Sequence, residues 1–186
     1  MKNSLLLIFT FLLFGFHQAV SRDFTFNSIN DLFGISMREI TAVERDDNGF
    51  VWAASRTGVL RVTADDYRLY ELPYATTDVM QVKMACRGNL LVVATQNGQV
   101  FRYNPVLNKF EQWFALSSLL GNEEWVTNLL IDGGGKVWIS TSAGIFYWTG
   151  GEVVRFFDGM AGFSNIALLD DCRALAFIQS SVYCIN

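Results

Sequence analysis

Asp46-Asp47-Asn48-Gly49-Phe50-Val51-Trp52-Ala53-Ala54-Ser55, followed by Gly58-Val59-Leu60-Arg61-Val62, is a stretch that the chain repeats twice in modified form. The second copy runs from Arg87 to Tyr103, and the third from Gly133 to Trp148. Each copy contains a turn, an apolar run that ends in Ser or Thr, a glycine and a second apolar run. The hydroxyl positions 55, 95 and 141 lie 40 and 46 residues apart. Repeats of this length are typical of β-propeller blades.

Four short strands are predicted in each copy, because short apolar or alternating runs are separated by glycine and Asx turns. The expected strands are 40–45, 50–55, 59–63 and 67–72, then 79–86, 89–95, 99–104 and 109–114, then 126–131, 136–141, 145–148 and 153–157. A degraded fourth copy begins at Ile166, with strands at 175–178 and 182–184. We therefore predict an all-β protein of three to four propeller blades in an incomplete ring.

The predicted organisation has three parts. Residues 1–21 form a signal peptide, 22–39 a lead-in segment and 40–186 the propeller repeats. The repeats divide into 40–73, 79–116, 126–159 and a partial 166–186.

The N-terminus has the features of a secretory signal peptide. Lys2 precedes the apolar run from Leu5 to Phe16, and Ala19-Val20-Ser21 offers a cleavage site after Ser21. Twelve residues of helix reach roughly 18 Å, well short of the roughly 30 Å hydrocarbon core of a membrane. We expect export to the periplasm and no membrane span after cleavage.

Composition and charge argue against several classes of function. The chain is 51% hydrophobic and 17% charged, with a formal net charge of −4. A globular, mildly acidic chain without a basic stripe is not expected to bind nucleic acid. It also has no polybasic segment for anionic lipids.

Three cysteines, Cys86, Cys172 and Cys184, would enter an oxidising compartment. Cys172 and Cys184 could pair if their strands are neighbours, and this stays open. The favoured interpretation is that Cys86 and Cys184 are small buried hydrophobes within strands.

Several motifs have both a structural and a functional interpretation. Trp52 and Trp138 occupy equivalent repeat positions, which favours blade-to-blade packing over stacking on a sugar ring. The run 46–49 has the composition of a calcium loop but lacks the later acidic ligand, so a turn is favoured. Glycines 133–135 are followed by a strand that begins at Lys136, whereas a phosphate-binding loop is followed by a helix. The long connection Ala115–Trp125 is either a binding loop or packing between blades.

No catalytic, cofactor-binding or metal-binding residue is predicted, and the ligand-binding residues are unknown. The one histidine, His17, lies in the predicted signal peptide. Histidine-dependent nucleophiles and metal sites are therefore not expected in the mature chain. A pair of carboxylates acting on a glycoside is not excluded by the sequence.

The three copies resemble the two-component regulator propeller repeat. The best match is Asp47-Asn48-Gly49-Phe50-Val51-Trp52 with Thr57-Gly58-Val59-Leu60-Arg61, preceded by Phe33-Gly34-Ile35-Ser36. The resemblance covers Leu32–Asn186 and implies the N-terminal, periplasmic sensor region of a hybrid two-component histidine kinase of the Bacteroidota. It further implies detection of glycan breakdown products.

We expect a non-catalytic ligand-binding segment that needs no cofactor and comes from a truncated sensor. Its expected partners are an oligosaccharide and either further blades or a second copy of itself. One alternative is a small exported scaffold that completes its ring by homo-oligomerisation. A propeller-type glycan lyase or hydrolase is the third interpretation.

Overall fold

The computed structural model describes residues 28, 31, 34, 37, 39–63, 66–74, 81–156, 164–170 and 173–185. The chain divides into two units, Met1–Ile35 and Ser36–Asn186. All the strands described below belong to the second unit. The predicted signal peptide lies outside the described residues, and so does most of the lead-in segment.

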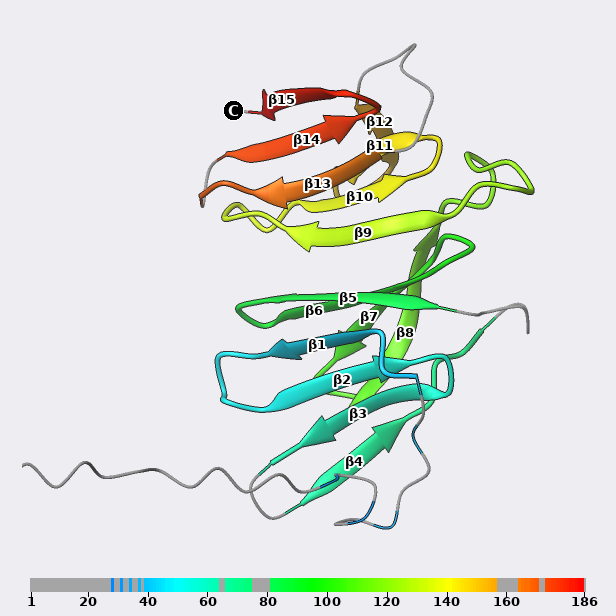
Figure 1. The fold of residues 1–186 in the computed structure, drawn as a ribbon. Helices are drawn as coiled ribbons and strands as arrows, with labels where there is room; N and C mark the ends of the chain where they lie inside the picture. Colours follow the sequence, from blue (N-terminus) through cyan, green and yellow to red (C-terminus); the bar gives the residue numbers. More distant parts are fainter. Residues whose placement is uncertain are drawn as a thin grey trace, which may run out of the picture. The chain divides into compact units, whose positions relative to one another are not determined.

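Fifteen strands are present in the described part of the chain, and they form four antiparallel sheets, which we call blades 1 to 4 (Figure 1). Blade 1 holds β1 (Ala42–Arg45), β2 (Val51–Ser55), β3 (Gly58–Val62) and β4 (Tyr67–Tyr70). Blade 2 holds β5 (Val82–Arg87), β6 (Leu90–Thr95), β7 (Gln99–Asn104) and β8 (Lys109–Ala115). Blade 3 holds β9 (Val126–Ile131), β10 (Val137–Thr141), β11 (Gly144–Trp148) and β12 (Val153–Phe156), and blade 4 holds β13 (Ser164–Leu168), β14 (Ala174–Ile178) and β15 (Ser181–Ile185).

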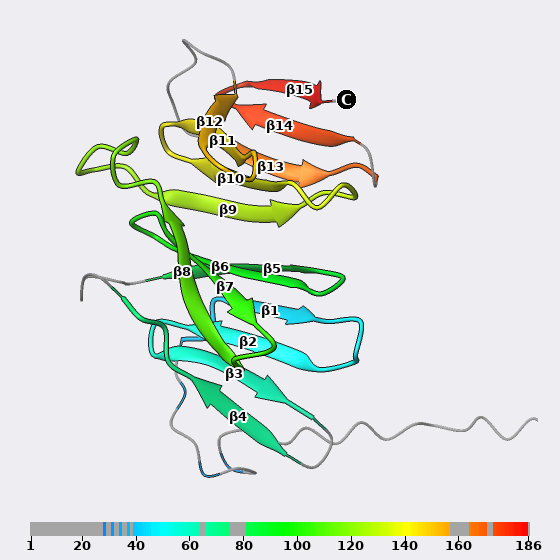
Figure 2. The ribbon, with the colours of Figure 1, turned by 180° about the vertical axis from the view of Figure 1, so that it is seen from behind.

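The predicted all-β fold of propeller blades is confirmed. Each of the first three sheets pairs its strands in chain order, and blade 4 has three described strands. Figures 1 and 2 show the sheets of this unit stacked in chain order, with β1, β5, β9 and β13 in succession along one side. The described sheets do not close into a ring.

Three hydrophobic cores lie between successive blades. The second strand of blade 2 shows how one sequence contributes to two of them. Leu91 and Val93 of β6 face the core shared with blade 1, whereas Val92 and Ala94 face the core shared with blade 3. Because both faces of such a strand are buried, its sequence is a continuous apolar run without polar alternation.

Two tryptophans anchor the turns that precede the second strands of blades 1 and 3. Asp46 accepts hydrogen bonds from the backbone N–H of Phe50 (2.9 Å) and from Nε1 of Trp52 (2.9 Å). Asp132 does the same with Lys136 (2.9 Å) and Trp138 (2.8 Å). Each aspartate therefore closes a tight turn and satisfies a buried indole N–H at the same time.

The predicted packing role of these tryptophans is confirmed, because Trp52 is 1% exposed and Trp138 is 4% exposed. The predicted turn at residues 46–49 is also confirmed, since Gly49 N–H donates to the carbonyl of Asp46 (3.0 Å). Glycines 133–135 lie in the turn between β9 and β10, as expected.

The prediction of burial is wrong for one cysteine. Cys86 is half-buried, but Cys184 is exposed on β15. The register places Cys184 opposite Leu175 and Val182 opposite Phe177, on the face of blade 4 that points away from the core shared with blade 3. No further described sheet covers that face. Cys172 lies outside the described residues, so the pairing of Cys172 with Cys184 stays open.

Candidate functional site

All blades present the same kind of loop at each end of their strands. We call the "connection end" the one that holds the β2–β3, β6–β7 and β10–β11 turns and the β4–β5 and β8–β9 connections. The opposite "turn end" holds the β1–β2, β5–β6, β7–β8 and β9–β10 turns. Loops on a rigid sheet scaffold are the usual place for binding groups, and the connection end holds the longer segments.

Hydrogen bonds join neighbouring blades at the connection end. Thr41 Oγ1 donates to the carbonyl of Val82 (2.7 Å), and Thr127 Oγ1 donates to the carbonyl of Ser164 (2.7 Å). Thr41 immediately precedes β1, and Thr127 is the second residue of β9. These bonds fix the spacing of the blades where their loops converge.

The hydroxyl residues that recur in the three copies hold the turns of their own blades. Thr95 Oγ1 is 2.6 Å from Asn97 Oδ1 and accepts the N–H of Gln99 (2.9 Å). Ser55 and Thr141 hold the corresponding turns through Thr57 (2.7 Å) and Ala143 (3.0 Å). All three hydroxyl residues are completely buried. They are therefore structural groups and are not exposed nucleophiles.

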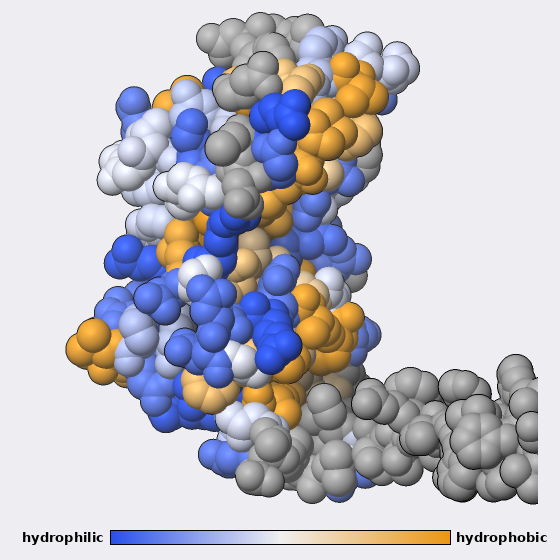
Figure 3. Space-filling view, turned by 90° about the vertical axis from the view of Figure 1, so that its left-hand side faces the viewer, coloured by the Kyte–Doolittle hydropathy of each residue, from blue (hydrophilic) through white to orange (hydrophobic). Residues whose placement is uncertain are grey.

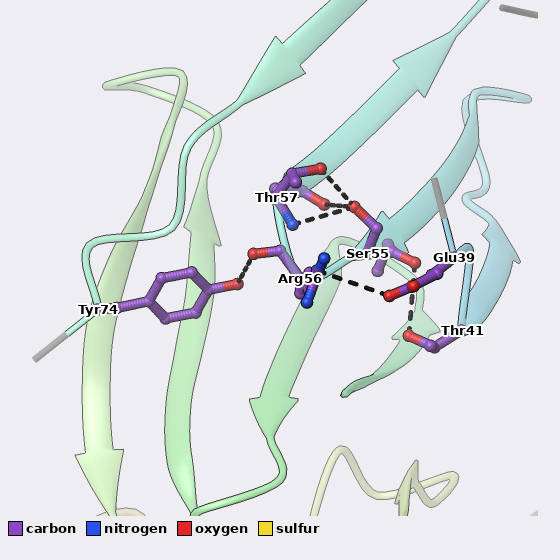
Figure 4. Close-up of polar contacts among 8 residues, drawn as sticks. Glu39, Thr41, Ser55, Arg56, Thr57 and Tyr74 are labelled. Atoms are coloured by element: carbon purple, nitrogen blue, oxygen red, sulfur yellow. Dashed lines mark hydrogen bonds and ion pairs between the residues drawn. The ribbon is translucent and has the colours of Figure 1, made fainter. Parts of the chain in front are cut away.

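A polar cluster joins blade 1 to the β4–β5 connection (Figure 4). The hydroxyl of Tyr74 donates to the backbone carbonyl of Arg56 (3.1 Å), and Arg56 Nε lies 3.5 Å from Glu39 Oε2. The ring of Tyr74 lies edge-on to Phe101 of blade 2, with 5.9 Å between centroids. Burial raises the pKa of Tyr74 to about 12, so its hydroxyl stays protonated at neutral pH. The Arg56–Glu39 pair is exposed and contributes little to stability.

The connection between β8 and β9 is both a packing element and an exposed surface. Leu116 is fully buried and its N–H donates to the carbonyl of Gly98 (2.8 Å). Leu119 and Trp125, in contrast, are 39% and 43% exposed. Leu116 therefore packs between blades, whereas Leu119 and Trp125 are available as parts of a binding loop.

Trp125 is held on a fixed backbone while its side chain is exposed. Its N–H donates to Ser142 Oγ (2.9 Å), and its carbonyl accepts the N–H of Ser142 (2.9 Å). The next residue, Val126, donates its N–H to the carbonyl of Gln96 in blade 2 (2.8 Å). All five tryptophans lie in the described part of the chain, and Trp125 is the exposed one among them. An exposed indole on a pre-ordered backbone provides a flat apolar surface for a ring-shaped ligand.

Sequence reasoning did not select Trp125, because it lies outside the repeated motif. One feature of the sequence could have identified it: unlike Trp52 and Trp138, Trp125 has no equivalent tryptophan in the other copies. No group of three or more His, Cys, Asp or Glu that could hold a metal ion occurs among the described residues. Within the same residues, no helix is long and apolar enough to cross a membrane.

Similarity to known proteins was found by comparing structures and not by comparing sequences. No family model and no curated protein matches the sequence. The chain is similar to the extracellular domain of the hybrid two-component system BT4673 of B. thetaiotaomicron, with a TM-score of 0.59, 13% identity, and coverage of 81% of this chain and 22% of that one. The corresponding domain of BT3049 from the same organism gives a TM-score of 0.56 at 13% identity, covering 80% and 20%.

YCF48 from Cyanidioschyzon merolae has a TM-score of 0.57 at 14% identity, with coverage of 78% of this chain and 49% of that one. The chain thus spans about a fifth of the two sensor-system domains and about half of YCF48. At these identities the likeness concerns the fold. The chain therefore consists of β-propeller blades similar to those of the extracellular domains of hybrid two-component systems.

Proposed function

We propose that this chain is an exported, non-catalytic sensor segment that binds a small glycan breakdown product at its connection end. The observation that carries the proposal is Trp125, an exposed indole whose backbone is hydrogen-bonded in both directions to Ser142. The fold similarity to extracellular domains of two-component systems supports a sensor role. The predicted signal peptide supports a periplasmic location.

The position of Trp125 suits a sensor because it lies where two blades meet. It immediately precedes β9 of blade 3, and Val126, the first residue of β9, is bonded to Gln96 of blade 2. A sugar ring stacked on the indole would contact this junction. Stacking of this kind is worth about 0.5–1.5 kcal/mol, which corresponds to roughly a twofold to tenfold change in affinity.

Calorimetric titration of the purified chain with neutral oligosaccharides tests the proposal. Trp125→Ala should weaken binding by up to about tenfold. Leu119→Ala is the matched control, because Leu119 is an exposed apolar residue of the same connection without an aromatic ring. Equal binding by both variants and the parent chain would contradict the assignment of Trp125.

An oligomerising scaffold is the second candidate, and exposed apolar side chains favour it. Val43 and Leu69 of blade 1 are 61% and 48% exposed, and Val182 of blade 4 is 60% exposed. These residues lie on the two sheets at either end of the described stack. A discrete dimer in light scattering would favour this candidate, and a monomer would count against it.

A further inference from the structure

We propose that blade 2 carries a second binding site, at its turn end, for a small ligand with an oxyanion group such as a carboxylate or a sulfate. The site is a cavity of about 490 Å³ lined by residues of blade 2 alone: Arg87, Asn89, Leu90, Arg102, Tyr103, Asn104 and Pro105. It is separate from Trp125 and the connection end. Nothing in the proposed sensor function requires it.

The sheet register places the two arginines on one face of blade 2. Arg87 of β5 lies opposite Leu90 of β6, and Arg102 of β7 lies opposite Val92. Leu90 and Val92 are two residues apart on one strand, so all four side chains project from the same face. The arginine-bearing strands are separated by one strand, which places their backbones roughly 10 Å apart.

The charge of the cavity is opposite to that of the chain. Two guanidinium groups line it and no carboxylate does, although the chain has a formal net charge of −4. Arginine presents a planar fork of donors that matches carboxylate and sulfate oxygens. Asn89 adds a polar group, while Leu90 and Pro105 supply apolar wall.

A nearby carboxylate is engaged by other groups. Glu111 accepts a hydrogen bond from Asn104 Nδ2 (2.9 Å) and lies 3.2 Å from Lys109 Nζ. The hydrogen bonds from Asn104 and Lys109 lower the pKa of Glu111, and the charge of Arg102 acts in the same direction. Both carboxylate oxygens therefore have partners within blade 2, and Glu111 shares its negative charge with Lys109 as well as with Arg102.

Contacts within blade 2 fix the cavity wall. The guanidinium of Arg102 lies 5.1 Å from the ring centroid of Trp113, a cation–π distance. The Oδ1 atom of Asn104 accepts the N–H groups of Val106 (3.0 Å) and Leu107 (3.1 Å), which orders the β7–β8 turn. Figure 3 shows the turn end, where hydrophilic residues cover much of the surface between apolar patches.

The test is equilibrium binding of three probes to the purified chain at low ionic strength: glucuronate, inorganic sulfate and neutral glucose. Glucuronate binding without sulfate binding identifies a carboxylated sugar as the ligand class, and the reverse identifies a sulfate group. Binding of both probes supports a general oxyanion site. No binding of either anion overturns the proposal, and so does equal binding of glucose and glucuronate by the Trp125→Ala variant, which lacks the indole of the connection end.

Variants locate the site. Arg87→Gln and Arg102→Gln should each weaken anion binding about tenfold or more, because each removes a charged donor. Arg68→Gln is the matched control: Arg68 is an exposed arginine 5.2 Å from the ring centroid of Tyr70, outside the cavity. Added NaCl should weaken binding by screening. Anion binding that falls equally in the Arg68 variant would overturn the placement at the cavity.

Discussion

Replacing Asp132 with alanine is the sharpest test of how the repeated turns hold the blades. Asp132 accepts three hydrogen bonds: from Trp138 Nε1 (2.8 Å), from Gly134 N (2.9 Å) and from Lys136 N (2.9 Å). Alanine removes all of them. The indole N–H of Trp138 would remain in a side chain that is 4% exposed.

The expected loss follows from these bonds. A buried donor left without a partner costs about 1–3 kcal/mol. The two turn N–H groups belong to exposed residues, so water replaces their partner and the added loss is about 1 kcal/mol. We expect Asp132→Ala to lower the free energy of unfolding by about 2–4 kcal/mol.

Urea unfolding followed by far-UV circular dichroism measures this change. Asp170→Ala is the matched control, because Asp170 also bonds a backbone N–H in a turn, that of Arg173 (2.8 Å), but bonds no indole. It should cost at most about 1 kcal/mol. Trp138→Phe keeps a ring and removes the donor, so the alanine substitution should cost about 1–3 kcal/mol less in that background. An equal loss in both backgrounds would refute the contribution of the Asp132–indole bond.

Three further predictions follow from single positions. Gly58→Ala should prevent stable folding of blade 1, because Gly58 has φ +144° and an added Cβ would clash with the carbonyl of Tyr70. Thermal melting should then show no cooperative unfolding transition for the variant, and a transition like that of the parent chain would contradict the prediction. Tyr74→Phe should lower the free energy of unfolding by about 0.5–1.5 kcal/mol in urea titrations through loss of its bond to Arg56 (3.1 Å), and an unchanged midpoint would count against that bond. Burial raises the pKa of Cys86 from 9.0 to about 11. The neutral Cys86 thiol therefore contributes fully to the free energy of unfolding below pH 9, and this contribution is lost as the pH rises through about 11. Cys86→Ala should reduce the fall in the free energy of unfolding between pH 9 and pH 11, and an identical fall would show that Cys86 does not cause it.

The blades could be predicted from the sequence because the same order of turns and apolar runs recurs in three copies. The run 50–55 is predicted as a strand, and β2 spans Val51–Ser55 with only its first residue exposed. Several strands begin or end one to three residues away from their predicted bounds. For example, β5 begins at Val82 rather than at residue 79. The exposure of Cys184 was missed because a strand pattern does not specify which sheet, if any, covers its outer face.

The candidate sites were beyond sequence reasoning for a different reason. The cavity in blade 2 depends on a register that brings Arg87 and Arg102 to one face across an intervening strand. The two residues are fifteen positions apart, near opposite ends of the second repeat copy, and the repeat pattern does not show that their side chains share a face. Trp125 depends on a long connection whose path is set by buried Leu116 and by Ser142. The repeat pattern identifies strands and turns, whereas Trp125 lies in a connection that differs between the copies.

This difference between copies has a consequence for how the chain would signal. Trp125 lies at a junction where the backbone bonds reach both Ser142 of blade 3 and, through Val126, Gln96 of blade 2. In the proposed function, a ligand stacked on Trp125 would lie at this junction, and it would shift the placement of the two blades if it binds one arrangement better than the other. The residues that line the arginine cavity all belong to blade 2, so an anion bound there would not act on the placement of two blades. If both proposed sites bind ligands, the ligand at the connection end is the one expected to change the arrangement of the blades, whereas the arginine cavity would select ligands that carry an oxyanion group.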